Sequence, residues 1–187
     1  LKDWLADESK KKYVSDRKAT QVMLNRLGYE LEGVEFDLLL ATYIMNPSVS
    51  GEDVATLASE FGYHDVQPNE VIYGKGAKWT EPEEDKLAEH VSRKAVAVWT
   101  LYPILEQKLK DNEQYDLYHE LELPLAHILG KMESEGITVQ VATLEKMGEE
   151  LASKLAIIEQ EIYGLAGEKF NINSPKQLGV ILFEKLG

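Results

Sequence analysis

Hydrogen-bond donors gather around the expected start of the last helix in the chain. Ser174 is followed by Pro175, and this pair is typical of a helix start because the hydroxyl accepts a first-turn amide and proline needs none. The nearby Asn171, Asn173 and Lys176 supply further donors without any carboxylate among them. Free amides, the positive end of a helix dipole and a lysine could together hold a phosphate. An ordinary capped surface helix explains the same spacing, so both interpretations stay open at this point.

The remaining reactive side chains form no catalytic or metal-binding pattern. The histidines are scattered, and the two nearest each other, His119 and His127, lie about two helical turns apart, too far for one metal ion. The lack of cysteine excludes disulfides and thiolate metal sites, which fits a reducing cytosol. Residues 74–76, Gly-Lys-Gly, are not a phosphate loop, because the required spacing and the Lys-Ser/Thr ending are missing.

The charge balance limits any contact with nucleic acid. The 187 residues carry a formal net charge of −13 at pH 7, which argues against a protein that coats nucleic acid with its whole surface. Any DNA contact must therefore be local, on a neutral or basic patch of an acidic body. No apolar run reaches membrane-spanning length, so we expect a cytoplasmic protein without membrane contact. Because the first residue is not Met, we expect a piece of a longer protein.

Helical periodicity dominates the chain, so the fold is expected to be mainly helical with a few short strands. Strand-like alternation is confined to residues 29–31, 34–36 and 137–139. Residues 63–82 are interrupted by proline and glycine and are expected to be irregular. Helices are expected from a cap at Ser15 or Asp16 to Gly28, from Asp37 to Asn46 and from Ser50 to Gly62. Further helices are expected over residues 83–109 with a kink or restart at Pro103, over 117–132, and from a Thr143 cap to residue 165.

A domain boundary is expected at residues 111–113, a charged stretch between two helical patterns. The chain then has two domains, residues 1–111 and 112–187. In the second domain, apolar residues recur about every seven positions between residues 144 and 165, with glutamates and lysines between them. This repeat is typical of a long helical arm that packs in an antiparallel pair.

Several segments together resemble the bacterial DNA polymerase I family. Residues 170–178 (FNINSPKQL) and 182–187 (LFEKLG) are similar to part of the thumb of these enzymes. Residues 120–125 and 132–139 are similar to the start of their polymerase domain. Upstream, residues 33–44 and 73–78 resemble their exonuclease-like domain. The similarity covers nearly the whole chain in the right order and is strongest to enzymes of Bacillus type.

This resemblance implies a specific architecture and activity. The fold should be α/β and mainly helical, with a partial ribonuclease H-like exonuclease domain followed by the helical start of a family A polymerase domain. The parent protein should be a monomeric DNA-directed DNA polymerase of replication and repair that uses Mg²⁺, deoxynucleoside triphosphates and primer-template DNA. Its catalytic aspartates would lie beyond Gly187. The thumb residues expected to contact DNA are Asn171, Asn173, Ser174 and Lys176.

The resemblance also locates the proofreading positions, which depart from the family pattern. Thr20 stands where a metal-binding acid is expected, and His90 and Lys94 stand in place of a tyrosine and an aspartate. A protonated lysine repels the divalent ion that aspartate would bind, so proofreading chemistry is expected to be lost. Two alternatives stay open. Asp16, Asp37 and His90 could form a different metal site, or the chain could be a non-catalytic scaffold that binds DNA or protein.

Overall fold

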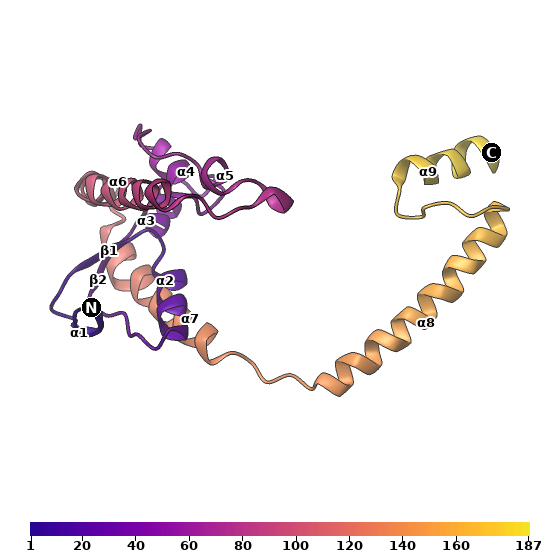
Figure 1. The fold of residues 1–187 in the computed structure, drawn as a ribbon, viewed down its shortest axis with the longest axis horizontal. Coiled ribbons are helices and arrows are strands. Elements are labelled where there is room, and N and C mark those ends of the chain that lie inside the picture. The colour runs from indigo at the N-terminus through magenta and orange to yellow at the C-terminus, as the bar shows by residue number, and fades with distance from the viewer. The chain divides into compact units, whose positions relative to one another are not determined.

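The computed structural model describes residues 1–187 and divides them into two compact units, Leu1–Gly136 and Ile137–Gly187 (Figure 1). The division falls after the predicted boundary at residues 111–112. That boundary concerns the sequence domains and stays a prediction. None of the helices combines the length and the apolar character that crossing a lipid bilayer requires.

Unit 1 contains a small parallel sheet that the first helices surround. A short helix α1 (Lys2–Ala6) leads to strand β1 (Lys12–Val14), and helix α2 (Arg17–Arg26) crosses over to strand β2 (Val34–Asp37). The strands are parallel, with Lys12 opposite Val34 and Tyr13 opposite Phe36. The strand predicted at residues 34–36 is confirmed. The strand predicted at 29–31 is wrong, because that stretch hydrogen-bonds to no neighbouring strand.

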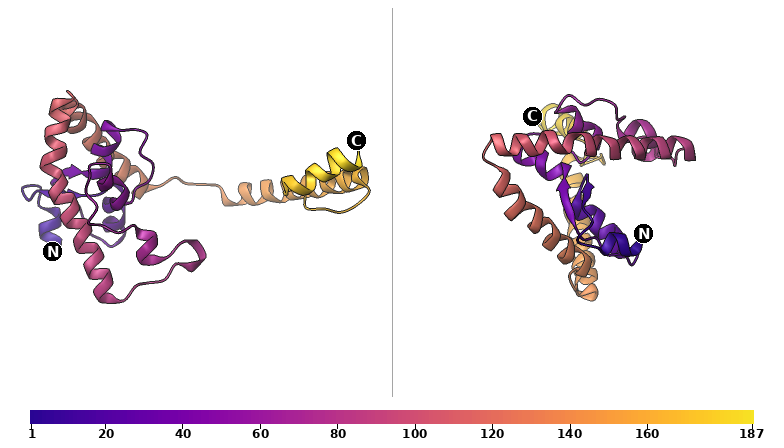
Figure 2. Two further views of the ribbon diagram at one scale, coloured as in Figure 1. Left: turned by 90° about the horizontal axis from the view of Figure 1, so that it is seen from above. Right: turned by 90° about the vertical axis from the view of Figure 1, so that its left-hand side faces the viewer.

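A series of helices follows the sheet in the chain. Helices α3 (Leu38–Met45) and α4 (Val54–Ser59) begin at aspartate caps, because the carboxylates of Asp37 and Asp53 accept first-turn amides. The segment predicted to be irregular contains a five-residue helix α5 (Asn69–Tyr73) and the single 3-10 turn η1 (Gly76–Lys78). The longest element is helix α6 (Glu84–Asp111). In the right-hand view of Figure 2, α6 and the later helix α7 (Leu123–Glu135) form the two sides of an angle.

The core of unit 1 lies between α6 and the sheet. One side of α6 is apolar and buried, and the exposed Pro103 lies on the other side. Proline leaves the carbonyl of residue 99 without its helical partner, but at an exposed position water can bond that carbonyl, so the helix continues through residue 103. The side chains with almost no exposure that form this core include Phe36, Leu38, Val54, Leu57, Leu101, Leu105 and Leu109.

The last two elements of unit 1 follow α6. Residues Leu117–Glu122 form a π-helical segment, η2, which passes directly into helix α7 (Leu123–Glu135). Pro124 lies at this junction and cannot donate a backbone hydrogen bond, so the wider π turn is a way of continuing the helix through it. Gly136, with a φ of 72°, ends α7. The predicted helix over 117–132 is therefore confirmed, with a local change of winding.

Unit 2 consists of a long helix, a turn and a short terminal helix. Helix α8 (Val141–Ala166) is followed by α9 (Pro175–Val180) and by a π-helical segment η3 (Ile181–Lys185). Gln140 lies at the helix start, so the predicted Thr143 cap is wrong, and Thr143 lies within the first turn. The predicted strand at 137–139 is also wrong, because it has no neighbouring strand to pair with.

Candidate nucleic-acid contact site and exonuclease-like positions

The turn before α9 is folded by its own side chains. Ser174 caps α9, with its hydroxyl accepting from the Gln177 amide at 3.4 Å. The Asn171 side-chain oxygen accepts from the Asn173 amide at 3.0 Å, and the Gln177 side-chain oxygen accepts from the Asn171 amide at 2.9 Å. The predicted cap is therefore confirmed. These short-range bonds give the turn a defined shape.

Contacts with the end of α8 hold this turn in unit 2. Phe170 meets the Tyr163 ring edge to face, with ring centroids 6.0 Å apart. Lys185 forms an ion pair with Glu168, and Ile181 is buried. The turn is consequently anchored on both sides.

Three of the four predicted contact residues present free donors on one turn. Asn171, Asn173 and Lys176 are exposed, and their side-chain nitrogens make no hydrogen bond or ion pair within the chain. Ser174 is half-buried, and its hydroxyl remains able to donate because it only accepts from Gln177. From residue 162 onward, three lysines accompany two glutamates, so the region escapes the strong negative charge of the whole chain. This turn therefore presents unpaired donors in a part of the chain without excess negative charge.

The threonine at the first exonuclease-like position is engaged within its own helix. The Thr20 hydroxyl donates to the Asp16 carbonyl at 2.6 Å, while the Asp16 carboxylate caps α2 by accepting from the Ala19 amide at 2.9 Å. Thr20 borders a cavity of about 650 Å³ that Ala95 and Trp99 of α6 also line. Thr20 thus faces α6, yet it brings no negative charge to that cavity.

His90 and Lys94 of α6 are both bound to one asparagine that the sequence analysis did not single out. The side-chain oxygen of Asn69 lies 2.9 Å from His90 Nε2 and 3.4 Å from Lys94 Nζ. Asn69 is itself fixed, because its amide donates to the Asp53 carboxylate at 2.6 Å. His90 is buried, and burial together with the Lys94 charge lowers the pKa of His90. The two positions therefore form a hydrogen-bonded cluster with Asn69 that does not suit a divalent cation.

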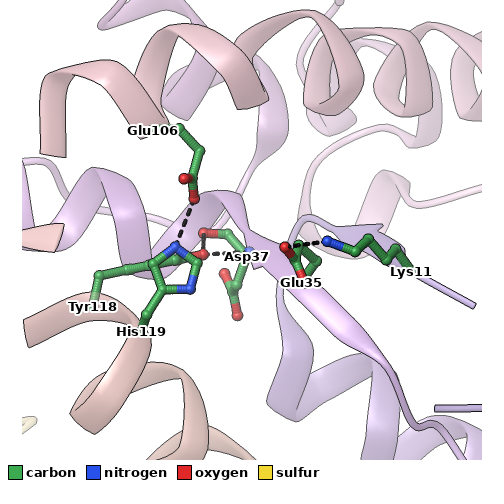
Figure 3. Close-up of polar contacts among 6 residues, drawn as sticks. All are labelled: Lys11, Glu35, Asp37, Glu106, Tyr118 and His119. Carbon is green, nitrogen blue, oxygen red and sulfur yellow. Dashed lines mark hydrogen bonds and ion pairs between the residues drawn. The ribbon is translucent and has the colours of Figure 1, made fainter. Parts of the chain in front are cut away.

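Asp37 is buried, caps α3 and also accepts from the first amide of α2. Its carboxylate accepts from the Arg17 amide at 2.7 Å and from the Leu40 amide at 3.0 Å, and burial raises its pKa to about 7. Figure 3 shows the Tyr118 hydroxyl against the Asp37 backbone, accepting from its amide at 2.7 Å and donating to its carbonyl at 3.1 Å. Each member of the alternative metal set is thus held in its own local structure. Across the chain, no three histidine or acidic side chains are grouped closely enough to hold a metal ion.

Further polar contacts in the same region were missed because their partners are far apart in sequence. His119 of η2 bonds Glu106 of α6 at 2.7 Å, and both side chains are mostly buried. Lys11, directly before β1, pairs with Glu35 of β2 at 2.8 Å, at the surface (Figure 3). These pairs connect η2 to α6 and β1 to β2, and they are structural contacts.

Comparison with known families decides the relationship of this chain. A family model described as DNA polymerase I, ribonuclease H-like domain, matches residues 1–101, which is more than half of the chain. This chain belongs to the DNA polymerase I family. A second model, DNA polymerase family A, matches residues 141–187. The resemblance and the fold class predicted from the sequence are both confirmed.

Individual relatives give the same result. The chain is 54% identical over 187 residues to DNA polymerase I of Bacillus subtilis and 54% identical over 183 residues to that of Bacillus caldotenax. These matches cover 100% and 98% of this chain but 21% of each relative, so the chain spans about a fifth of the length of these DNA polymerases I.

A solved structure supports the fold over the full chain. It is the POL domain of Pol1 from M. smegmatis in complex with DNA primer-template and dNTP. The TM-score is 0.78 and the identity is 28%, over 100% of this chain and 30% of that one.

Proposed function

We propose that this chain is part of a DNA-directed DNA polymerase and supplies a nuclease-like platform and an element that grips duplex DNA. The observation that supports this most directly is the turn before α9. It lies within the region matched by the family A model, and Asn171, Asn173 and Lys176 present unpaired donors there. Ser174, at the helix start, adds a hydroxyl donor.

The four residues would bind the phosphates and the minor-groove edge of the primer-template duplex. Lys176 would supply charge, and the two asparagine amides and the serine hydroxyl would supply hydrogen bonds of fixed direction. Contacts of this type position a duplex without reading its sequence, as a polymerase that copies any template requires. The similar structure with bound DNA primer-template and dNTP supports duplex DNA and deoxynucleoside triphosphates as partners of the whole protein.

Polymerisation would use Mg²⁺, and no part of residues 1–187 provides a suitable cluster of acids for it. In this proposal the metal ions and the nucleotide bind to a polymerase region outside the matched 47 residues at the end of the chain. The whole protein would act as a monomer in the cytoplasm.

We propose that proofreading chemistry is lost. Two-metal nucleases need acids to hold their ions, and Thr20, His90 and Lys94 offer a hydroxyl, a buried imidazole and a cation instead. With Mg²⁺ or Mn²⁺, the chain should release no nucleotides from single-stranded DNA above background. Metal-dependent release that disappears in Asp16→Ala would contradict this proposal, since Asp16 is the nearest acid to the Thr20 position.

Primer extension tests the polymerase assignment. A longer protein that includes this chain and the complete family A region should extend a primer on a template when Mg²⁺ and deoxynucleoside triphosphates are present. Residues 1–187 alone should add no nucleotide. A longer protein that binds DNA but adds no nucleotide would instead be the non-catalytic scaffold, which the acidic, nuclease-like unit 1 would also fit.

A further inference from the structure

An ion pair brackets the turn before α9. Glu168 follows the end of α8 and Lys185 is the last residue of η3, so the donor residues 171–176 fall between the two partners in the chain. Lys185 Nζ donates to the Glu168 carboxylate, and the two side chains keep 48% and 44% of their surface exposed. The pair is thus open to solvent and to any ligand that approaches the turn.

An unpaired carboxylate at position 168 would oppose phosphate binding. Only two residues separate Glu168 from Asn171, and three peptide units span at most about 11 Å. The Debye length is about 10 Å at 0.1 M salt, so a charge on Glu168 would act on a phosphate held at Asn171 with limited screening. Duplex DNA presents one negative charge per about 1.7 Å of its axis, so the repulsion would involve several phosphates.

As a mechanical link, the same pair contributes little. Exposed ion pairs stabilise a fold weakly, because water screens both charges and two long side chains lose rotamer freedom. The turn has stronger anchors in the buried Ile181 and in the edge-to-face contact of Phe170 with Tyr163. The effect of Lys185 on the charge that DNA meets is therefore larger than its effect on folding.

We propose that Lys185 neutralises Glu168 and thereby keeps the turn before α9 able to accept the phosphates of duplex DNA. This inference rests on the proposed function, in which that turn binds the duplex. After residue 162 three lysines accompany two glutamates, so loss of Lys185 would remove the single excess positive charge of this region. Lys185 acts through Glu168 and contacts no phosphate, so it is a positioning residue for the DNA contact.

Duplex binding by two single variants and their combination tests this role in the 187-residue chain. Lys185→Met leaves the Glu168 carboxylate unpaired and should weaken binding of a labelled primer-template duplex about two- to fivefold at 0.1 M salt. Glu168→Gln should bind at least as tightly as the unsubstituted chain, because it removes a negative charge. The combination of both substitutions should restore the unsubstituted affinity. Fluorescence anisotropy measures all four proteins.

The ion pair of Lys146 with Glu150 is a matched control in the same unit. It is also exposed, and Lys146 lies twenty residues before the end of α8, about 30 Å along the helix axis and about three Debye lengths at 0.1 M salt. Lys146→Met and Glu150→Gln should leave duplex affinity unchanged. Hydrogen exchange checks the turn itself: the Asn171 amide, which donates to the Gln177 side chain, should exchange equally fast with and without Lys185.

The other outcomes overturn the inference. A combined variant that binds as weakly as Lys185→Met would show that Lys185 itself contacts a phosphate. Weaker binding by Glu168→Gln, or faster exchange of the Asn171 amide in Lys185→Met, would show that the pair is a structural clamp. Equal losses in Lys185→Met and Lys146→Met would show an effect of net charge alone. Lys176→Met separates the two proposals: weaker binding by this variant with normal binding by Lys185→Met defeats the neutralising role alone, and normal binding by both defeats the DNA contact as well.

Discussion

At the residue scale, burial disfavours the ionised form of the Asp37 carboxylate in the folded state. The amides of Arg17 and Leu40 stabilise the ionised form, but burial outweighs them and raises the pKa of Asp37 to about 7. The unfolded chain releases this proton near pH 4. Between these values the folded state therefore binds the extra proton, and stability from this group falls as pH rises toward 7.

Asp37→Asn should flatten the pH dependence of unit 1 stability. In the unsubstituted chain, Asp37 should lower the free energy of unfolding by up to about 1.4 kcal/mol per pH unit between pH 5 and pH 7. The variant should lack this contribution, because asparagine binds no proton. Urea denaturation, monitored by tryptophan fluorescence at several pH values, measures the free energy of unfolding of unit 1, since Trp4, Trp79 and Trp99 all lie there. An unchanged slope in the variant would show that Asp37 titrates in its ordinary range.

At the scale of elements, the contact between α2 and α7 depends on a glycine. A Cβ at Gly130 would lie 2.9 Å from the Gln21 amide, which is buried and bonded twice to His127. Moving that amide breaks both bonds, whereas a methyl group at Gly148 of α8 meets no atom within 4 Å. The two glycines are therefore a matched pair for testing the interface.

Gly130→Ala should destabilise unit 1 by about 1–3 kcal/mol, through overpacking and the lost hydrogen bonds. Gly148→Ala should leave the tryptophan-detected transition unchanged and strengthen α8 by up to about 1 kcal/mol, because alanine favours helix. Denaturation by fluorescence and hydrogen exchange of the α7 and α8 amides measure the two effects. If Gly130→Ala left α7 exchange unaffected, the interface would be looser than these contacts indicate.

The sequence predicted elements that local chemistry decides. The helix starts near Asp16 and at Asp37 and Ser174 were predicted correctly because a helix cap needs only its own first turn. The strands expected at 29–31 and 137–139 were wrong because a strand also needs a partner, which alternation does not supply.

In the candidate site too, local features could be predicted from the sequence and contacts between distant residues could not. The donors of the turn before α9 lie within six residues, so they could be recognised as a group from the sequence. The Asn69 contact with His90 and Lys94 joins positions 21 and 25 residues apart, and nothing local in the irregular segment predicted it.

At the scale of the whole molecule, the proposed DNA contact lies in a part of the chain that does not share the overall negative charge. The chain carries a net charge of −13, yet the region from residue 162 onward has more lysines than carboxylates. A local contact of this kind should bind duplex DNA weakly and lose affinity as salt rises. A proofreading site would have needed additional acids in unit 1, and Lys94 there adds a cation instead.

The most direct test is duplex binding by Lys176→Met compared with Lys146→Met. Both remove one lysine from unit 2, but Lys146 lies on α8 and faces Glu150 at 3.9 Å. Fluorescence anisotropy with a labelled primer-template duplex across a salt series should show weaker binding for Lys176→Met, with the slope of log affinity against log salt reduced by about 0.9. Lys146→Met should match the unsubstituted chain. Equal losses in both variants, or no loss in Lys176→Met, would contradict the assignment of this turn as a DNA contact.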